Sequence, residues 1–166
     1  MNKKGIGEKV ILWVPRMIFL AIVMITIIFL TRFIVAIYVE TVDAQATVYI
    51  NKILYDKDGI IRYENGRPYP GVIVMGRFNE ENLNSSMAFE TEGERPCAKL
   101  LLKNLENDEE TAIFWNKIWY ERMRPRAAFR GIGSPYLKHV TVLVSVYENG
   151  RYVPATLNID MVVPRK

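Results

Sequence analysis

The sequence predicts an α+β fold, in which a long N-terminal helix is followed by an antiparallel β-sheet domain. Three observations lead to this prediction. A mostly apolar run occupies residues 17–39. The next stretch spaces its apolar residues as one face of a helix does. After Asp58-Gly59 the period changes to that of strands, and the last two strand-like runs are joined by the turn sequence Asn149-Gly150.

The apolar run is a candidate membrane span. Residues 17–30 read MIFLAIVMITIIFL, and apolar residues continue to Val39 after Arg32. A span needs about 20 apolar residues, so the helix also uses the residues after Arg32 or those before Met17. Arg32 then either lies near one interface with its charge extended towards water or faces a protein partner. The run is too long for a typical secretory signal, and no small-residue cleavage site follows it.

Charge indicates the orientation of this span. Four basic residues precede it, and Glu40 and Asp43 are the first charges after it. By the positive-inside rule, we expect the N-terminus in the cytoplasm and the C-terminal domain outside it, as a single-pass protein of the cell membrane. The predicted organisation is a basic cytoplasmic leader (1–16), a transmembrane helix (17–39), a helix extension packing on the sheet (40–57) and an extracytoplasmic β-rich domain (58–166).

The segment after the span has one apolar helical face. Its apolar residues recur at intervals of three and four, and no Pro or Gly interrupts residues 17–57. We therefore expect one continuous helix from the bilayer to about Tyr55, whose outer part covers one face of the sheet. The predicted face comprises Val42, Ala46, Tyr49, Ile50, Ile53 and Leu54.

The rest of the chain predicts four to six antiparallel strands with one face open to water. In the clearest strand, residues 136–147, valines occupy every second position from 140 to 146, and residues 152–163 return as its partner, interrupted by Pro154. A short helix is expected between Phe78 and Met87, with Asn79 as its N-cap. Further strand-like runs occupy residues 60–63, 69–74, 98–103 and 111–115, and Pro68 and Pro70 indicate an edge or loop passage at the start of the second run.

The N-terminal residues Lys3-Lys4-Gly5-Ile6 resemble the processing site of type IV pilin-like proteins, where basic residues and a glycine precede a long hydrophobic helix. The resemblance implies cleavage after Gly5, a mature chain that begins at Ile6, and a helix that packs with its copies in a filament core. The overall layout is shared as well. The sequence departs from the bacterial pattern, because Glu8 would be third and not fifth after the cut. The alternative is the ordinary cytoplasmic flank of an uncleaved anchor.

The domain also resembles a group of uncharacterised small, single-span archaeal envelope proteins. The residues that carry this resemblance are INKILY at 50–55, GRPYPG at 66–71 and the terminal hairpin. It implies an envelope setting and supplies no activity.

Composition excludes several kinds of site. The chain has one cysteine, Cys97, and one histidine, His139, which cannot make an internal disulfide, a zinc finger or a His-rich metal site. A Cys–His nucleophilic pair is allowed by count, but Cys97 follows Pro96 in a stretch read as a polar turn, where nothing indicates an activated thiol. Since no nucleophile–base pair and no set of carboxylates arranged for catalysis can be placed either, we expect no enzymatic activity, no metal and no cofactor.

The candidate contact residues are four arginines, in a segment read as a basic loop or turn. Arginine binds phosphate and carboxylate groups bidentately, so the segment suits an acidic ligand or partner, an anionic lipid surface, or plain exposure to solvent. Nucleic acid is disfavoured, because the domain is expected outside the cell. Asn84, in Asn84-Ser85-Ser86, matches the glycosylation acceptor pattern. The arginines are Arg122, Arg124, Arg126 and Arg130.

The sequence thus predicts a non-catalytic, membrane-anchored extracytoplasmic protein that works by assembly or contact. In the sharper form of this hypothesis it is a pilin-like structural subunit, whose partners are the lipid bilayer and further copies of itself or other envelope proteins. The alternative is an anchored binding module or accessory subunit, which contacts an acidic ligand or a partner through the arginine-rich segment.

Overall fold

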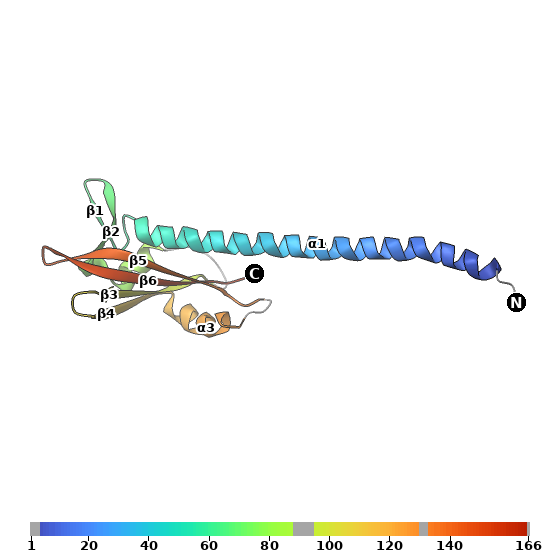
Figure 1. The fold of residues 1–166 in the computed structure, drawn as a ribbon. Helices are drawn as coiled ribbons and strands as arrows, with labels where there is room; N and C mark the ends of the chain where they lie inside the picture. The colour runs from blue at the N-terminus through green and yellow to red at the C-terminus, as the bar shows by residue number, and fades with distance from the viewer. Residues whose placement is uncertain (1–3, 88–94, 130–132, 166) are drawn as a thin grey trace. The chain divides into compact units, whose positions relative to one another are not determined.

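The computed structural model describes residues 4–87, 95–129 and 133–165. The chain divides into two compact units, Met1–Thr41 and Val42–Lys166. One long helix, α1 (Lys4–Tyr55), fills the described part of the first unit and continues into the second (Figure 1). The second unit is a β-sheet domain, so the predicted α+β fold class is confirmed. The end of the helix at Tyr55 also agrees with the sequence.

The first unit carries a mostly apolar stretch that has nothing packed on it among the described residues. Every described side chain from Trp13 to Ile37 is exposed, and this helix is long and apolar enough to cross a membrane. The hydroxyls of Thr26 and Thr31 donate to the carbonyls of Ile22 and Ile27 at 2.9 and 2.8 Å. These polar groups are therefore satisfied within the helix, as a lipid environment requires.

The part of the domain that the structure describes forms a six-stranded sheet with the strand order β1-β2-β5-β6-β3-β4. The sheet is mostly antiparallel, as predicted, and differs from the prediction in one place, where β2 and β5 pair in parallel. Between β2 and β5 the described residues form three short helices and two other strands, so β2 and β5 are not joined by a hairpin and either direction is open to them. The strands are β1 (Ile61–Glu64), β2 (Arg67–Val74), β3 (Cys97–Asn104), β4 (Glu110–Trp115), β5 (Tyr136–Glu148) and β6 (Arg151–Val163).

The hairpin of β5 and β6 is the longest element of the sheet. Asn149 and Gly150 have φ values of 49° and 80°, which is the left-handed backbone of the predicted type I′ turn. The expected interruption at Pro154 is absent, because β6 is continuous from Arg151 to Val163. The pairing of β3 with β6 ends at Ala155, so Pro154 lies just outside that ladder and its missing N–H costs no hydrogen bond there.

The core lies between α1 and one face of the sheet, here called the inner face. Val42, Ala46, Ile50 and Ile53 of α1 are buried, as the helical spacing predicted, and the Tyr49 ring lies 5.7 Å from the ring of Trp115. The sheet contributes alternate residues, which include Leu100, Ile113, Val144, Val146, Leu157, Ile159 and Met161.

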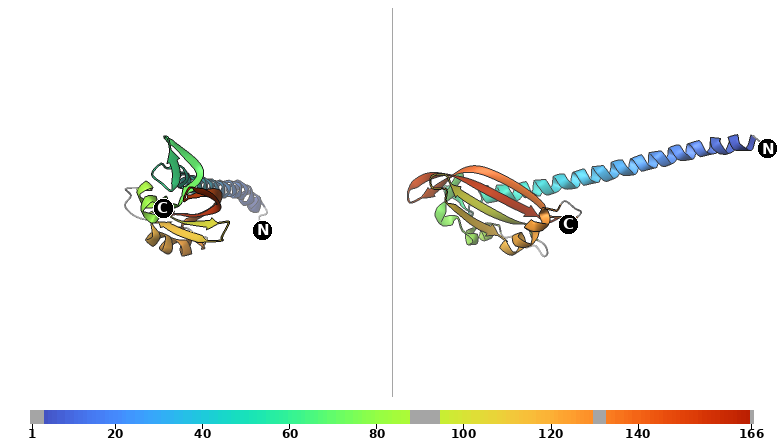
Figure 2. Two further views of the ribbon diagram at one scale, coloured as in Figure 1. Left: turned by 90° about the vertical axis from the view of Figure 1, so that its left-hand side faces the viewer. Right: turned by 60° about the horizontal axis from the view of Figure 1, so that its bottom comes forward.

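The described residues of the domain also form three short helices: a 3₁₀ turn, η1 (Met75–Arg77), and two α-helices, α2 (Glu80–Ser86) and α3 (Lys117–Ala127). The predicted N-cap of α2 is confirmed, because the Asn79 side chain accepts a hydrogen bond from the backbone N–H of Asn82 at 2.8 Å. Helix α3 corrects the prediction of a basic loop or turn. It packs on the outer face of the sheet, near the C-terminal end of β6 (Figure 2).

Candidate functional site

Helix α3 positions three of the four candidate arginines, Arg122, Arg124 and Arg126. Asn116, just before the helix, has a left-handed backbone with φ 53°, and its side chain donates to the carbonyl of Pro96 at 2.8 Å. Tyr120 and Met123 form the buried face of α3 and pack against Cys97 and Val162. These apolar residues, three positions apart, are the signal that the sequence reading missed. The opposite face of the helix is exposed.

The structure separates the predicted arginine cluster. Arg122 and Arg126 are one turn apart on the exposed face of α3, and the Arg122 guanidinium lies 5.9 Å from the Trp119 ring centroid. Arg124 points the other way, with its Nε atom 4.0 Å from Oδ2 of Asp160 on β6. Arg130 lies outside the described residues. The site therefore has two parts, an exposed face and a polar cluster beneath it.

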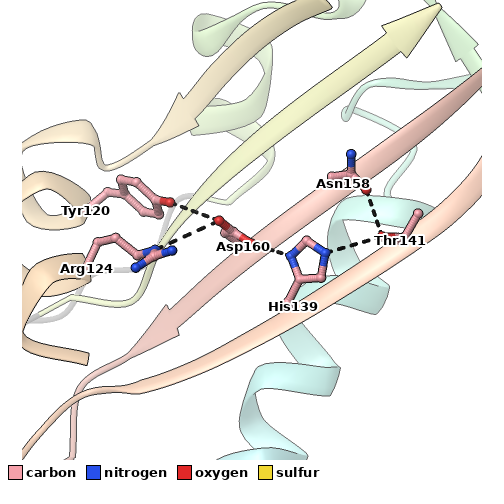
Figure 3. Close-up of polar contacts among 6 residues, drawn as sticks. All are labelled: Tyr120, Arg124, His139, Thr141, Asn158 and Asp160. Carbon is pink, nitrogen blue, oxygen red and sulfur yellow. Dashed lines mark hydrogen bonds and ion pairs between the residues drawn. The ribbon is translucent and has the colours of Figure 1, made fainter. Parts of the chain in front are cut away.

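The polar cluster is centred on Asp160 and joins α3 to the outer face of the sheet (Figure 3). Oδ1 of Asp160 lies 2.5 Å from Nδ1 of His139, and Oδ2 accepts a hydrogen bond of 3.2 Å from the Tyr120 hydroxyl. Burial, followed by the charge of Asp160, raises the pKa of Tyr120 to about 12. We call Tyr120, Arg124, His139, Thr141, Asn158 and Asp160 the Asp160 cluster.

Sequence reasoning missed the Asp160 cluster, although the hairpin held a signal for it. A two-residue turn at Asn149-Gly150 pairs Glu148 with Arg151, and each step away from the turn pairs the next residues on the two strands. Counted in this way, His139 faces Asp160 and Thr141 faces Asn158, as the structure shows. Helix α3 supplies the rest of the cluster, and its position cannot be counted from the turn.

The Asp160 cluster contains a hydroxyl, an imidazole and a carboxylate side by side, as in the relay that activates a catalytic nucleophile. The Thr141 hydroxyl lies 3.3 Å from Nε2 of His139, whose Nδ1 faces Asp160. Activation requires that this hydroxyl donate to the imidazole, in a site that excludes water and holds an oxyanion. In the structure the Thr141 hydroxyl donates instead to Oδ1 of Asn158 at 2.7 Å, and the side chain of His139 is 60% exposed. The geometry therefore suits a structural contact between α3 and the sheet better than it suits catalysis.

Cys97 is the first residue of β3 and is fully buried, which corrects its placement in a polar turn. Burial raises the pKa of its thiol to about 12. Since only the thiolate is a good nucleophile, this residue has the character of a core side chain.

A second polar group joins α1 to the inner face of the sheet. Oδ1 of Asp43 accepts hydrogen bonds from the Tyr136 hydroxyl and from Nζ of Lys138, each at 2.7 Å, and Lys138 also contacts the Thr47 hydroxyl at 2.8 Å. The bond from Lys138, then that from Tyr136, lowers the pKa of Asp43. Asp43 and Thr47 lie outside the predicted apolar face of α1, and these contacts place them beside β5.

The remaining sequence candidates belong to neither cluster. Gly5 and Ile6 are part of α1. Asn84 is exposed in α2, but Ser86, the third position of its acceptor pattern, is buried and donates to the carbonyl of Leu83 at 3.0 Å. Glycosylation of Asn84 stays a prediction. Within residues 13–37, 41–87, 95–129 and 133–165, no three His, Cys, Asp or Glu side chains are grouped so as to hold a metal ion.

The chain was compared with protein-family models, with curated proteins and with solved structures, and no match was found.

Proposed function

We propose that this chain is a non-catalytic, membrane-anchored protein whose β domain lies outside the cytoplasm and works by assembly or contact. One observation carries the proposal: from Trp13 to Ile37 every side chain of α1 is exposed and, apart from two arginines and two threonines, apolar, yet the helix buries a single face in the domain from Val42 onwards. A helix that is apolar all round requires lipid or other apolar helices around it. The first part of α1 therefore suits a bilayer or a helical assembly, and the second part holds the domain.

In its sharper form, the proposal is a pilin-like subunit. Support comes from the length of α1, 52 residues, and from the way its last turns form part of the domain core. This is the layout that the resemblance of residues 3–6 implies. Processing after Gly5 would then free the apolar helix for packing with its copies.

The decisive experiment for the pilin-like form is mass spectrometry of the native N-terminus, on protein purified from its own membranes. We expect a chain that starts at Ile6. The variant Gly5→Leu should keep the leader, whereas Gly7→Leu, the same change two positions later, should still be processed. An intact leader on the unmodified chain would contradict the pilin-like form and leave the plain anchor.

Orientation is tested by labelling with a membrane-impermeant maleimide on intact cells. Asn149→Cys places a thiol at the exposed tip of the β5–β6 hairpin, and the buried Cys97 should stay unlabelled. We expect Asn149→Cys to react on intact cells and Lys9→Cys, in the basic leader, to react only after lysis. The reverse pattern would refute the proposed orientation.

A second candidate function is an anchored binding module. The observation in its favour is the exposure of Arg122 and Arg126 on one face of α3. The double variant Arg122→Gln/Arg126→Gln should lose a co-purifying acidic partner, and Arg67→Gln, at an exposed position on β2, should retain it. Arg124 stays unchanged in this test because it contacts Asp160. If the double variant keeps every partner, the binding module is refuted.

A further inference from the structure

Helix α3 lies at the end of the domain where α1 enters. The chain enters the domain at Val42, and the next residue, Asp43, is hydrogen-bonded to Tyr136 and Lys138 on β5. Leu137, between those two residues on the opposite face of the strand, packs against the buried face of α3. Helix α3 and the first turn of α1 in the domain therefore flank the same three residues of β5.

The link from this end of the domain to the apolar helix is short. Only residues 40 and 41 lie between Val39, the last residue of the predicted span, and Val42. Three Cα-to-Cα steps cover at most about 11 Å, whatever the angle of the domain. The headgroup layer on each side of a bilayer is roughly 5–8 Å thick. If the span lies in lipid, Val42, where the chain enters the domain beside these β5 residues, thus lies within about 11 Å of the end of the span.

The exposed face of α3 has the chemistry of a lipid-contacting surface. Ile118 and Phe129 expose 67% and 75% of their surfaces at its two ends, and Arg122 and Arg126 lie between them. Basic residues flanked by large apolar side chains are typical of interfacial helices on anionic membranes. Glu121 is the acidic residue on this face, and the exposed Lys117 precedes it. We call Ile118, Glu121, Arg122, Pro125, Arg126 and Phe129 the α3 outer face.

We propose that the α3 outer face is a membrane-contacting surface that binds the anionic headgroups of the bilayer in which α1 is anchored. The arginines pair with lipid phosphates, and Ile118 and Phe129 insert beside them. The Asp160 cluster has a supporting role: through Tyr120 and Arg124 it holds the buried face of α3 on the sheet, which keeps the outer face directed away from the sheet. The inference rests on the proposed membrane anchoring and adds a second contact with the same bilayer.

The test uses the full chain in lipid nanodiscs that contain a quencher-labelled lipid with the quencher near the headgroup. A fluorophore is attached to Ile118→Cys or to Phe129→Cys, with the buried Cys97 left as it is. In discs of phosphatidylcholine and phosphatidylglycerol, we expect both probes to be quenched at least twofold more than a probe on Asn149→Cys, at the far end of the hairpin. In discs of phosphatidylcholine alone, and in an Arg122→Gln/Arg126→Gln background, this extra quenching should be lost.

A probe at Ile25→Cys separates this inference from the anchoring on which it rests. Its quenching by a deep-placed quencher reports insertion of α1. If Ile25→Cys is quenched but the two α3 probes match Asn149→Cys, the membrane-contacting surface is refuted and the anchor stands. If Ile25→Cys is not quenched, both fail. Equal quenching of the α3 probes in both kinds of disc would refute the role of the arginines.

Discussion

The substitution Ile53→Ala tests whether the last turns of α1 belong to the core of the domain. Ile53 is fully buried, with an exposed fraction of 0%, in the last turn of the helix. The change removes three carbon atoms, which corresponds to about 2.4 kcal/mol of lost transfer free energy at about 0.8 kcal/mol each. A cavity term adds to this, so we expect the free energy of unfolding to fall by about 3 kcal/mol. For a domain of this size, that lowers Tm by roughly 10 °C.

The matched control is Val48→Ala on the same helix, since Val48 is 64% exposed. It should change the free energy of unfolding by no more than about 0.5 kcal/mol. Thermal unfolding is followed by near-UV circular dichroism in detergent micelles, where the Trp115 ring that contacts Tyr49 reports on the core. Equal Tm values for the two variants would refute the packing of α1 on the sheet.

Three further predictions concern ionisable groups. The hydrogen bonds that Asp43 accepts lower its pKa below the usual value of 3.8. Their contribution to stability is therefore fully present above pH 3.8 and is lost as the pH falls through the lowered pKa. The variant Asp43→Asn should accordingly show a smaller loss of Tm between pH 7 and pH 3. The pKa of Tyr120 is raised to about 12, so the folded residue keeps its proton to higher pH than the unfolded one. The free energy of unfolding should therefore fall between pH 10 and pH 12, and less steeply in Tyr120→Phe. At pH 7, urea unfolding should show that this variant has lost about 1 kcal/mol of that free energy. The thiol of Cys97, whose pKa burial raises to about 12, should react with Ellman's reagent only after unfolding; rapid reaction of the folded chain would contradict its burial.

Local patterns predicted the elements whose periodicity is strong. The four-residue and three-residue steps from Val42 to Ile53 identified the buried face of α1, and Asn79 identified the start of α2. The type I′ turn fixed the β5–β6 hairpin, because a two-residue turn sets the register of both strands. In these cases the interaction that forms the element is close in sequence.

Non-local pairing was not predictable in the same way. The parallel contact of β2 with β5 pairs Val72–Val74 with Ser145–Tyr147. The residues of neither segment indicate which strand it will pair with. Helix α3 was missed because Pro125 and the arginines dominate its composition, although Tyr120 and Met123 gave a weak helical signal. The Asp160 cluster depends on both facts together, since it needs the hairpin register and the docking of α3.

The same non-local contacts changed the interpretation of individual side chains. Arg124 belonged to a presumed contact cluster and instead points at Asp160. Asp43 and Thr47 lie outside the predicted apolar face of α1, yet both bind Lys138 of β5. A charged residue on a helix has the same sequence signature whether it meets water or a partner on a strand, and only the packed structure distinguishes the two.

The central claim is that the N-terminal part of α1 is lodged in a lipid bilayer. The most direct measurement is extraction of native membranes with alkaline carbonate, which releases peripheral proteins, followed by extraction with detergent. We expect the chain to stay in the carbonate pellet and to be released only by detergent. Recovery of the intact chain in the aqueous fraction without detergent would contradict the account.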